Sequence, residues 1–247
     1  MPRITLVGQE AGGVGKSTVV RGMAEAIPDA PIIEIEASSR IIEYDHGRAK
    51  GPKRVTHFPV RADRALVERS GGQAARAEFD PVINAMMDTK LPTIIDIGAN
   101  AALSLLGTFD EEMISAFAEN NIELALAVVV TADASSLSAG AKLVAAAKTW
   151  AAATFVIDNR VRGNTDPAIV KRLADGATVT TLARAEFESH TMRFLQAMGL
   201  AAIPSLRASD LQAEYGFAQA RRMVADLKAF RLAVMEAVRP AATWLVS

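Results

Sequence analysis

The chain of 247 residues contains no cysteine. Without thiols it forms no disulfide, no thiolate metal site and no iron–sulfur cluster, and it has no cysteine nucleophile. Its net charge of −1 gives no overall attraction to nucleic acid or to anionic membranes. No apolar run approaches the roughly eighteen residues of a membrane-spanning helix, and the N-terminus lacks the pattern of a signal peptide. We therefore expect a cytoplasmic protein with no membrane span.

Half of the residues are hydrophobic, which at this length is enough for one large core. Short runs rich in Ile and Val alternate with longer segments whose apolar residues recur at helical spacing. This alternation predicts a doubly wound, mostly parallel α/β sheet with helices on both faces, in a single domain over residues 1–247. The predicted strands are Ile4–Val7, Pro31–Glu36, Thr93–Ile97, Leu124–Thr131, Thr154–Asp158 and Thr178–Leu182. The predicted helices are Lys16–Ala26, Gly72–Asp88, Asp110–Asn120, Ser135–Ala152, Pro167–Leu173, Glu186–Met198 and one inside Ala218–Val238.

The segment EAGGVGKST, residues 10–18, lies between the first predicted strand and the first predicted helix. Glycines let backbone N–H groups approach a phosphate closely, and the start of a helix adds partial positive charge. The order Gly-Lys-Ser-Thr is typical of a phosphate-binding loop, in which Lys16 reaches the β and γ phosphates and Ser17 binds Mg²⁺. Thr18 would cap the helix or contact the α phosphate. The other residues expected to surround the nucleotide are Gly12, Gly13, Val14 and Gly15.

The same segment resembles the deviant Walker A motif of the ParA/MinD-type ATPases, which belong to the SIMIBI class of P-loop NTPases. That motif is Lys-Gly-Gly-x-Gly-Lys-Ser/Thr-Thr, and the chain matches it from Gly12 to Thr18. The resemblance implies ATP and Mg²⁺ as cofactors, slow ATP hydrolysis and a homodimer. In the family the first lysine reaches the partner's phosphates across a nucleotide-sandwiched dimer, and here that position is Ala11, whose methyl group donates no hydrogen bond.

Two further segments extend the resemblance. The strand in PTIIDIGAN resembles a Walker B strand, in which Asp96 holds the water shell of Mg²⁺ and Gly98 lets the next loop approach the γ phosphate. In IIEIEASSR, Glu34 and Glu36 lie where the family has an acidic element, so Glu36 is a candidate for positioning the attacking water or Mg²⁺. The alternatives are a helix cap for Asp96 and a solvent-facing strand residue for Glu36.

Asn159 ends the strand in TFVIDNRVRGNTD, where related enzymes use an asparagine to contact the base. A guanine site would require Asn-Lys-x-Asp, whereas residues 159–162 are Asn-Arg-Val-Arg and lack the carboxylate that accepts from guanine. The sequence therefore favours ATP over GTP. The alternative for Asn159 is an ordinary turn residue.

Basic residues gather in residues 48–69, inside a segment, Asp45–Arg69, that we expect to be a loop. They are Arg48, Lys50, Lys53, Arg54, Arg61, Arg64 and Arg69. Because this segment follows the strand that ends at Glu36, it should lie over the edge of the sheet where the nucleotide binds. Two interpretations stay open: a solvated loop, or a surface for DNA or a DNA-bound partner protein.

Three functions remain open at this stage. The resemblance implies a nucleotide-dependent switch ATPase in plasmid partition, DNA positioning or conjugative transfer, of the StbB, MobD or TraL kind, with Lys16, Glu36 and Asp96 in hydrolysis. Lack of cysteine argues against the iron–sulfur branches of the family, and a count of two tyrosines argues against its self-phosphorylating kinases. The second function is a nucleotide-binding scaffold with little hydrolysis. The third is a small-molecule kinase or ATP-dependent ligase, similar to dethiobiotin synthetase.

Overall fold

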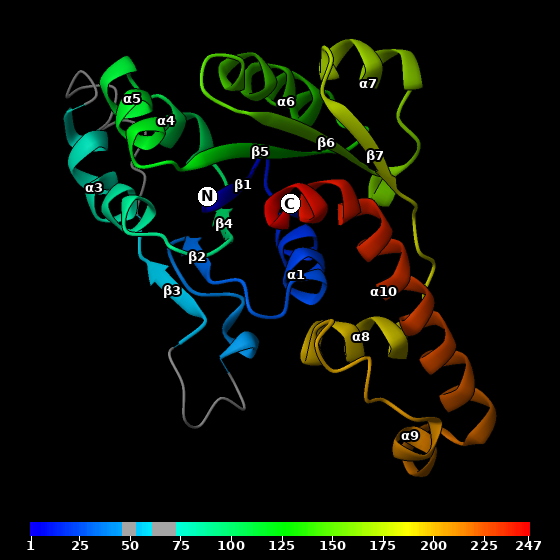
Figure 1. The fold of residues 1–247 in the computed structure, drawn as a ribbon. Helices are drawn as coiled ribbons and strands as arrows, with labels where there is room; N and C mark the ends of the chain where they lie inside the picture. Colours follow the sequence, from blue (N-terminus) through cyan, green and yellow to red (C-terminus); the bar gives the residue numbers. More distant parts are fainter. Residues whose placement is uncertain (46–52, 61–72) are drawn as a thin grey trace.

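The computed structural model describes residues 1–45, 53–60 and 73–247. Within these ranges seven strands form one sheet in the order β3-β2-β4-β1-β5-β6-β7, and every neighbouring pair is parallel (Figure 1). The strands are β1 (Arg3–Gly8), β2 (Ile32–Ile35), β3 (Val55–Phe58), β4 (Thr93–Ile97), β5 (Glu123–Val130), β6 (Ala153–Asn159) and β7 (Thr178–Leu182). The predicted parallel α/β fold is confirmed. Because the strands are parallel, all their carboxyl ends lie at the same edge of the sheet.

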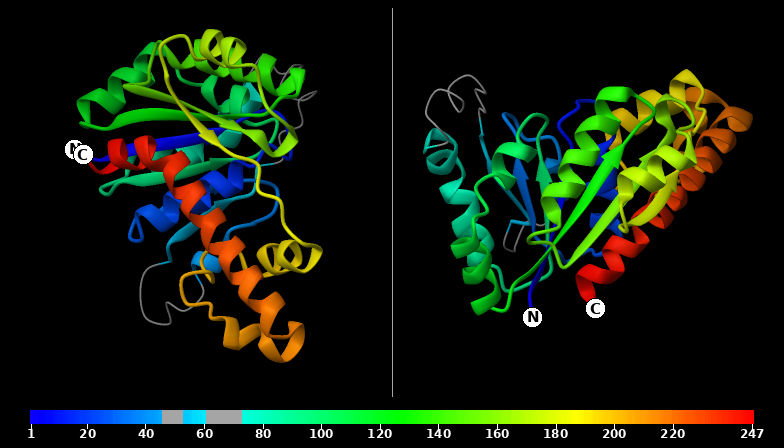
Figure 2. Two further views of the ribbon diagram at one scale, coloured as in Figure 1. Left: turned by 90° about the vertical axis from the view of Figure 1, so that its right-hand side faces the viewer. Right: turned by 90° about the horizontal axis from the view of Figure 1, so that it is seen from above.

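Helices cover both faces of this sheet (Figure 2). On one face lie α1 (Lys16–Ala26) and α10 (Phe217–Val246). The opposite face carries α3 (Gln73–Met87), α4 (Ala102–Leu106), α5 (Glu111–Glu119), α6 (Ala134–Ala147) and α7 (Pro167–Ala174). Two further helices, α8 (Ser189–Met198) and α9 (Ala208–Tyr215), pack on α10. Short 3-10 turns are present at Ile42–Tyr44 and Arg160–Arg162.

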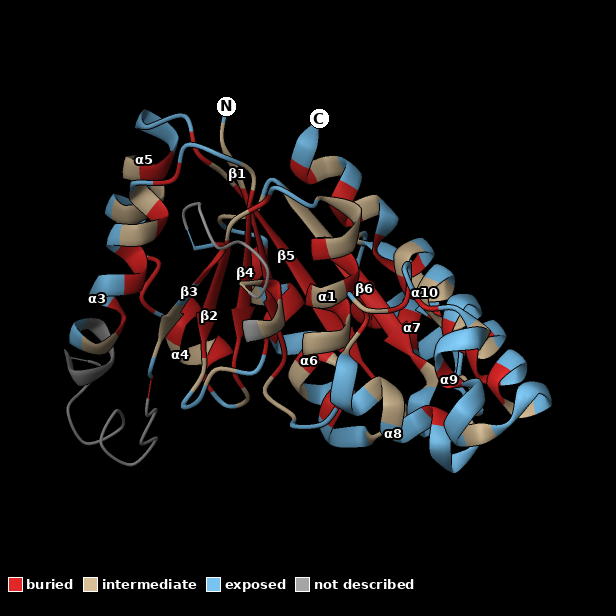
Figure 3. Ribbon diagram, turned by 90° about the horizontal axis from the view of Figure 1, so that it is seen from below, coloured by how far each residue is buried: buried red, intermediate tan, exposed pale blue. Residues whose placement is uncertain are grey.

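The central strands are buried along almost their whole length (Figure 3). Both faces are covered by helices, so these strands have continuous apolar sequences, such as Leu124–Val130, in place of an apolar and polar alternation. In contrast, α8 and α9 expose much of their surface (Figure 3). Within the ranges given above, no helix is both long and apolar enough to cross a bilayer.

The segment expected to be a loop contains strand β3, so that prediction was wrong over residues 55–58. Val55 pairs with Ile32 of β2 and is buried, which gives the short strand a place in the core. β3 has only four residues, and these lie between basic side chains, so its alternation of apolar and polar residues is too short to be recognised as a strand. Residues 46–52 and 61–69 of the same segment lie outside the described residues.

Both interpretations of the basic segment expect Arg54 to be exposed to solvent, and for this residue both are wrong, because its side chain is buried. The guanidinium donates to the carbonyl oxygens of Ala24, Ile27 and Ala30 at 2.8 to 2.9 Å. It also lies 5.0 Å from the ring centroid of Tyr44. Carbonyl groups at the end of a helix lack intrahelical partners, so Arg54 satisfies the end of α1 and the turn that follows it. This residue is therefore not available to a DNA-binding surface.

The C-terminal helix is longer than predicted and continues through Pro240 to Val246. A proline inside a helix removes one backbone donor and disfavours continuation of the helix. The residues after the proline, including Ala241 and Leu245, are buried against the core, and that burial outweighs the unfavourable local preference.

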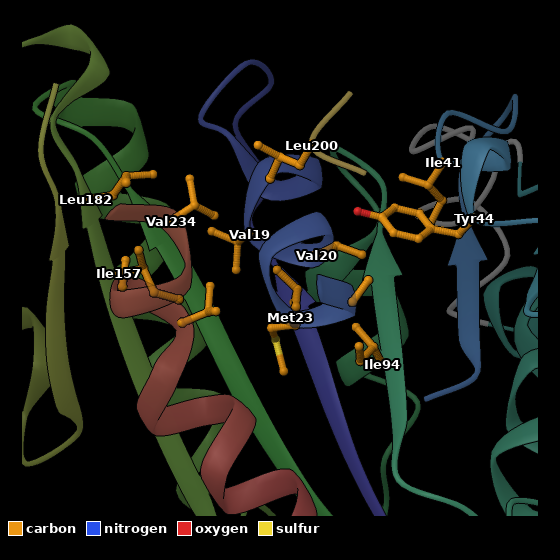
Figure 4. Packing of buried hydrophobic residues seen from close by; sticks show 14 of the residues in the cluster. Val19, Val20, Met23, Ile41, Tyr44, Ile94, Ile157, Leu182, Leu200 and Val234 are labelled. Atoms are coloured by element: carbon orange, nitrogen blue, oxygen red, sulfur yellow. The ribbon is translucent and has the colours of Figure 1, made fainter. Parts of the chain in front are cut away.

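A glycine sets the close approach of α1 to α10. A Cβ atom built on Gly22 would lie 2.5 Å from Cγ1 of Val234 and 3.3 Å from Cγ1 of Val238. Val234 is fully buried and lies next to Val19 of α1 (Figure 4). The contact therefore leaves no room for a larger residue at position 22.

We expect Gly22→Ala to lower the free energy of unfolding by about 1 to 3 kcal/mol, because the added methyl group overpacks this contact. Helix propensity alone predicts the opposite sign, since alanine is favoured over glycine by about 1 kcal/mol. Urea unfolding of the purified variant measures the change. The double variant Gly22→Ala, Val234→Ala should be more stable than the two single changes predict in sum. A Gly22→Ala protein more stable than wild type would contradict the close packing.

Candidate functional site

A cavity of about 720 Å³ lies at the carboxyl edge of the sheet, next to the loop that follows β1. Its walls come from this loop, from α1, from the segment after β2, from the ends of β6 and β7, and from α8. The residues that matter below are Gly13, Gly15, Thr18, Arg40, Asn159 and Leu182. In open α/β sheets, ligands bind outside the carboxyl ends of the strands, so the position of the cavity is that of a ligand site.

The loop enters α1 through a left-handed turn. Gly13 has φ 70° and Gly15, the N-cap of α1, has φ 94°, a backbone region that glycine adopts without strain. A Cβ atom on Gly15 would lie 2.3 Å from the Asn159 amide nitrogen, whereas one on Gly12 would meet nothing within 4 Å. The first N–H groups of a helix have no intrahelical acceptor, so the start of α1 offers donors to an anion.

Lys16 is buried and folds back over the loop. Its Nζ donates to the carbonyl oxygens of Gln9 at 3.1 Å and Ala11 at 3.3 Å. Burial lowers the pKa of Lys16, while the nearby carboxylates of Asp96 and Glu36 act in the opposite direction. The loop therefore holds a cation inside its curve, with acidic groups close by.

Asp96 lies on β4, in register with Val7 at the end of β1. Burial raises the pKa of its carboxyl group to about 6, although the charge of Lys16 and a hydrogen bond from the Ser17 side chain both favour the ionised form. A carboxylate and a hydroxyl oxygen are ligands that Mg²⁺ accepts, usually alongside water and phosphate oxygens. Among the described residues no group of three acidic or histidine side chains forms a complete metal cluster. Ser17 and Asp96 therefore fit a metal ion that arrives with a phosphate.

Glu36 lies directly after β2, close to the end of β4. The N–H of Gly98 donates to the carbonyl oxygen of Ile35 at 2.7 Å. A Cβ atom on Gly98 would lie 2.8 Å from that oxygen and 3.1 Å from the Glu36 carboxyl carbon. Glycine at this position thus allows Glu36 to approach the strand that carries Asp96. The structure brings the predicted residues Lys16, Ser17, Glu36 and Asp96 together.

Asn159 connects the loop to the end of β6. Its side-chain amide donates to the carbonyl oxygen of Val14 at 2.8 Å, and its carbonyl accepts from the N–H of Val161 at 3.3 Å. Both ends of the side chain therefore contact backbone, as expected for a turn residue that also supports the loop. Asn159 lines the cavity as well, and a contact with the base stays a prediction.

Sequence reasoning missed two residues that fix the start of the loop. Gln9 is fully buried, and its Nε2 donates to the carbonyl oxygens of Val129 at 2.9 Å and Ser136 at 3.0 Å. The Glu10 carboxylate accepts from the N–H of Leu103 in α4 at 2.7 Å. No motif marks these residues; the available signal was two polar side chains between a buried strand and a glycine-rich loop.

Comparisons with known proteins gave structural similarity alone. The chain matches no protein-family model and none of the curated proteins. Apo McdA from Cyanothece is 13% identical, with 96% of this chain and 100% of that chain covered, at a TM-score of 0.48. A Cyanothece McdA variant in complex with ATP is 12% identical, with 94% of this chain and 96% of that chain covered, at a TM-score of 0.46. MinD, a cell division protein of Aquifex aeolicus, is 13% identical, with 92% of this chain and 96% of that chain covered, at a TM-score of 0.39. Likeness at this level carries no argument on function, which rests on the residues of the site.

We expect Asp96→Asn to raise the free energy of unfolding at pH 7.5, without nucleotide, by about 1 to 3 kcal/mol. The folded protein keeps the Asp96 proton up to about pH 6, whereas the unfolded chain releases it near 3.8, so ionisation destabilises the fold above this window. The gain should therefore shrink between pH 6 and pH 4 and vanish below. Urea unfolding of both proteins at several pH values measures it. A gain that does not change with pH would contradict the assignment.

Proposed function

We propose that this chain binds ATP with Mg²⁺ at residues 9–18 and hydrolyses it slowly, as a cytoplasmic nucleotide-dependent switch of the ParA/MinD type. The observation that carries the proposal is the meeting of Lys16, Ser17 and Asp96 at the left-handed turn of Gly15. A cation, a hydroxyl group and a carboxylate at the start of a helix match the needs of a Mg²⁺-bound triphosphate.

Each residue has a separate task in this proposal. The backbone of Gly12, Gly13, Val14 and Gly15 surrounds the phosphates. Lys16 exchanges its carbonyl partners for phosphate oxygens, and Ser17 with Asp96 holds Mg²⁺. Glu36 orients the water that attacks the γ phosphorus while the bond to the bridging oxygen of ADP breaks, which releases ADP and phosphate.

The cavity beyond the loop suits an adenine base. Leu182 and Leu200 contribute apolar lining to this cavity, and Thr18, in the first turn of α1, lines it near the expected position of the α phosphate. An apolar wall with few polar groups is typical of sites for flat ring systems. ATP remains favoured over GTP because residues 159–162 lack a carboxylate for guanine.

Within this function we propose a role in plasmid or DNA partition, positioning or conjugative transfer. The motif resemblance supports it, and so does the basic segment, in which DNA or a DNA-bound protein would contact residues other than the buried Arg54. Those residues are Arg48, Lys50, Lys53, Arg61, Arg64 and Arg69. A nucleotide-binding scaffold with little turnover is the second candidate, and the methyl group of Ala11 favours it.

We expect Lys16→Ala to weaken binding of Mg·ATP by about a hundredfold or more, because two charge-assisted contacts to phosphate oxygens are lost. Isothermal titration of the full chain measures the affinity. Lys171→Ala is the matched control, since Lys171 is an exposed lysine on α7 and its removal changes the net charge equally. Unchanged affinity of the Lys16 variant would overturn the proposed function.

Sedimentation velocity without nucleotide, with ADP and with the analogue AMP-PNP separates the two candidates. A switch should form a dimer with AMP-PNP but not with ADP or without nucleotide. Its rate of ATP hydrolysis should rise when DNA is added, and this stimulation should fall as the salt concentration increases. A scaffold should bind nucleotide in one oligomeric state and show negligible turnover under every condition.

A further inference from the structure

Arg40 stands on the segment after β2 and lines the same cavity as Gly13, Gly15 and Thr18. No motif indicated this residue as part of a nucleotide site. Its side chain is 61% exposed, unlike those of Lys16 and Asp96, so its charged end is available to a ligand that enters the cavity. A guanidinium group at this position would interact with a negatively charged part of a ligand in the cavity.

The backbone of Arg40 is held from both sides. Its N–H donates to the carboxylate of Glu34 at 2.6 Å, and its carbonyl oxygen accepts from the guanidinium of Arg21 at 2.6 Å. Glu34 is buried and also accepts from the hydroxyl of Ser39. Arg21 in turn pairs with Glu43 at 2.5 Å. Such a support fixes where the side chain starts and reduces the conformational entropy lost when it binds.

The side chain extends toward the acidic side of the site. In the described part of the chain its one ion-pair partner is Glu36, with 3.6 Å between Nη2 and Oε1. Its charge also lowers the pKa of Lys16, which places it within electrostatic range of the loop. A contact of 3.6 Å is too long for a strong hydrogen bond, and a guanidinium has five N–H donors, so the group keeps capacity for another acceptor.

The charges at this edge of the sheet leave a bound triphosphate with too few positive partners. Asp96, Glu34 and Glu36 bring three carboxylates to this edge of the sheet, whereas Lys16 is the cation inside the loop. A triphosphate adds further negative charge at the end nearest Asp96 and Glu36. Arg40 can neutralise it there with the bidentate geometry that guanidinium and phosphate share.

We propose that Arg40 binds the γ phosphate from within the same chain and so makes the site prefer ATP over ADP. The inference rests on the proposed function, because it needs a nucleotide in the loop. Arg21 and Arg162 also lie near the loop, but each is held by a much shorter ion pair than that of Arg40, with Glu43 at 2.5 Å and with Asp133 at 2.6 Å. Arg184 lines the cavity from the segment after β7, on the side that suits the base.

The test is the ratio of the dissociation constants for ADP and AMP-PNP, measured by titration of the full chain at fixed Mg²⁺. Arg40→Ala should lower this ratio about tenfold, because it weakens the binding of AMP-PNP and leaves the affinity for ADP nearly unchanged. Arg40→Lys should keep part of the preference, since it retains the charge but not the bidentate geometry. Arg184→Ala is the matched control and should leave the ratio unchanged, even if both affinities fall.

One further variant separates a direct contact from an effect through Glu36. If Arg40 acts only by masking the Glu36 charge, the double variant Glu36→Gln, Arg40→Ala will have the same ratio as Glu36→Gln alone, and this would overturn the inference. A direct contact predicts a lower ratio in the double variant. Wild-type protein that binds neither nucleotide would refute the proposed function itself, whereas binding of both with an unchanged ratio in Arg40→Ala would refute only the role of Arg40.

Discussion

The left-handed turn at Gly15 is the constraint on which the site depends. It starts α1 directly against Asn159, at a distance that leaves no space for a side chain on residue 15. Since the helix begins at this point, Lys16 folds over the loop carbonyls and the Ser17 side chain meets Asp96. A shift of the turn by one residue would separate these three groups, because successive helical residues point about 100° apart.

The packing of the core holds that turn in place. The second half of α1 packs against α10 at Gly22 and Arg54 binds the carbonyl groups at its C-terminal end, while Gln9 ties the loop to β5. Within this frame the site keeps a lysine whose pKa is lowered and a carboxyl group whose pKa is raised. Both shifts arise mainly from burial, so the protein without nucleotide stores unfavourable charge that a Mg²⁺-bound phosphate would relieve.

The sequence predicted the features that depend on residues close together in the chain and missed those that depend on tertiary contacts. The order of strands and helices and the loop of residues 10–18 follow from periodicity and from a contiguous motif. Strand β3 was missed because a short edge strand has little periodic signal, and Arg54 was assigned to the surface because its carbonyl partners come from another element. The placement of Arg40 likewise depends on contacts with Glu34 and Arg21, which no motif describes.

Hydrogen–deuterium exchange of the full chain, with and without Mg·AMP-PNP, tests the central claim most directly. If the loop binds the phosphates, exchange should slow over residues 9–18, 36–40 and 96–100, which meet at the carboxyl edge of the sheet, and stay unchanged over α7 on the opposite face. Unchanged exchange over residues 9–18 at a saturating concentration of the analogue would contradict the account, because the backbone N–H groups of that loop are the proposed hydrogen-bond donors to the phosphates.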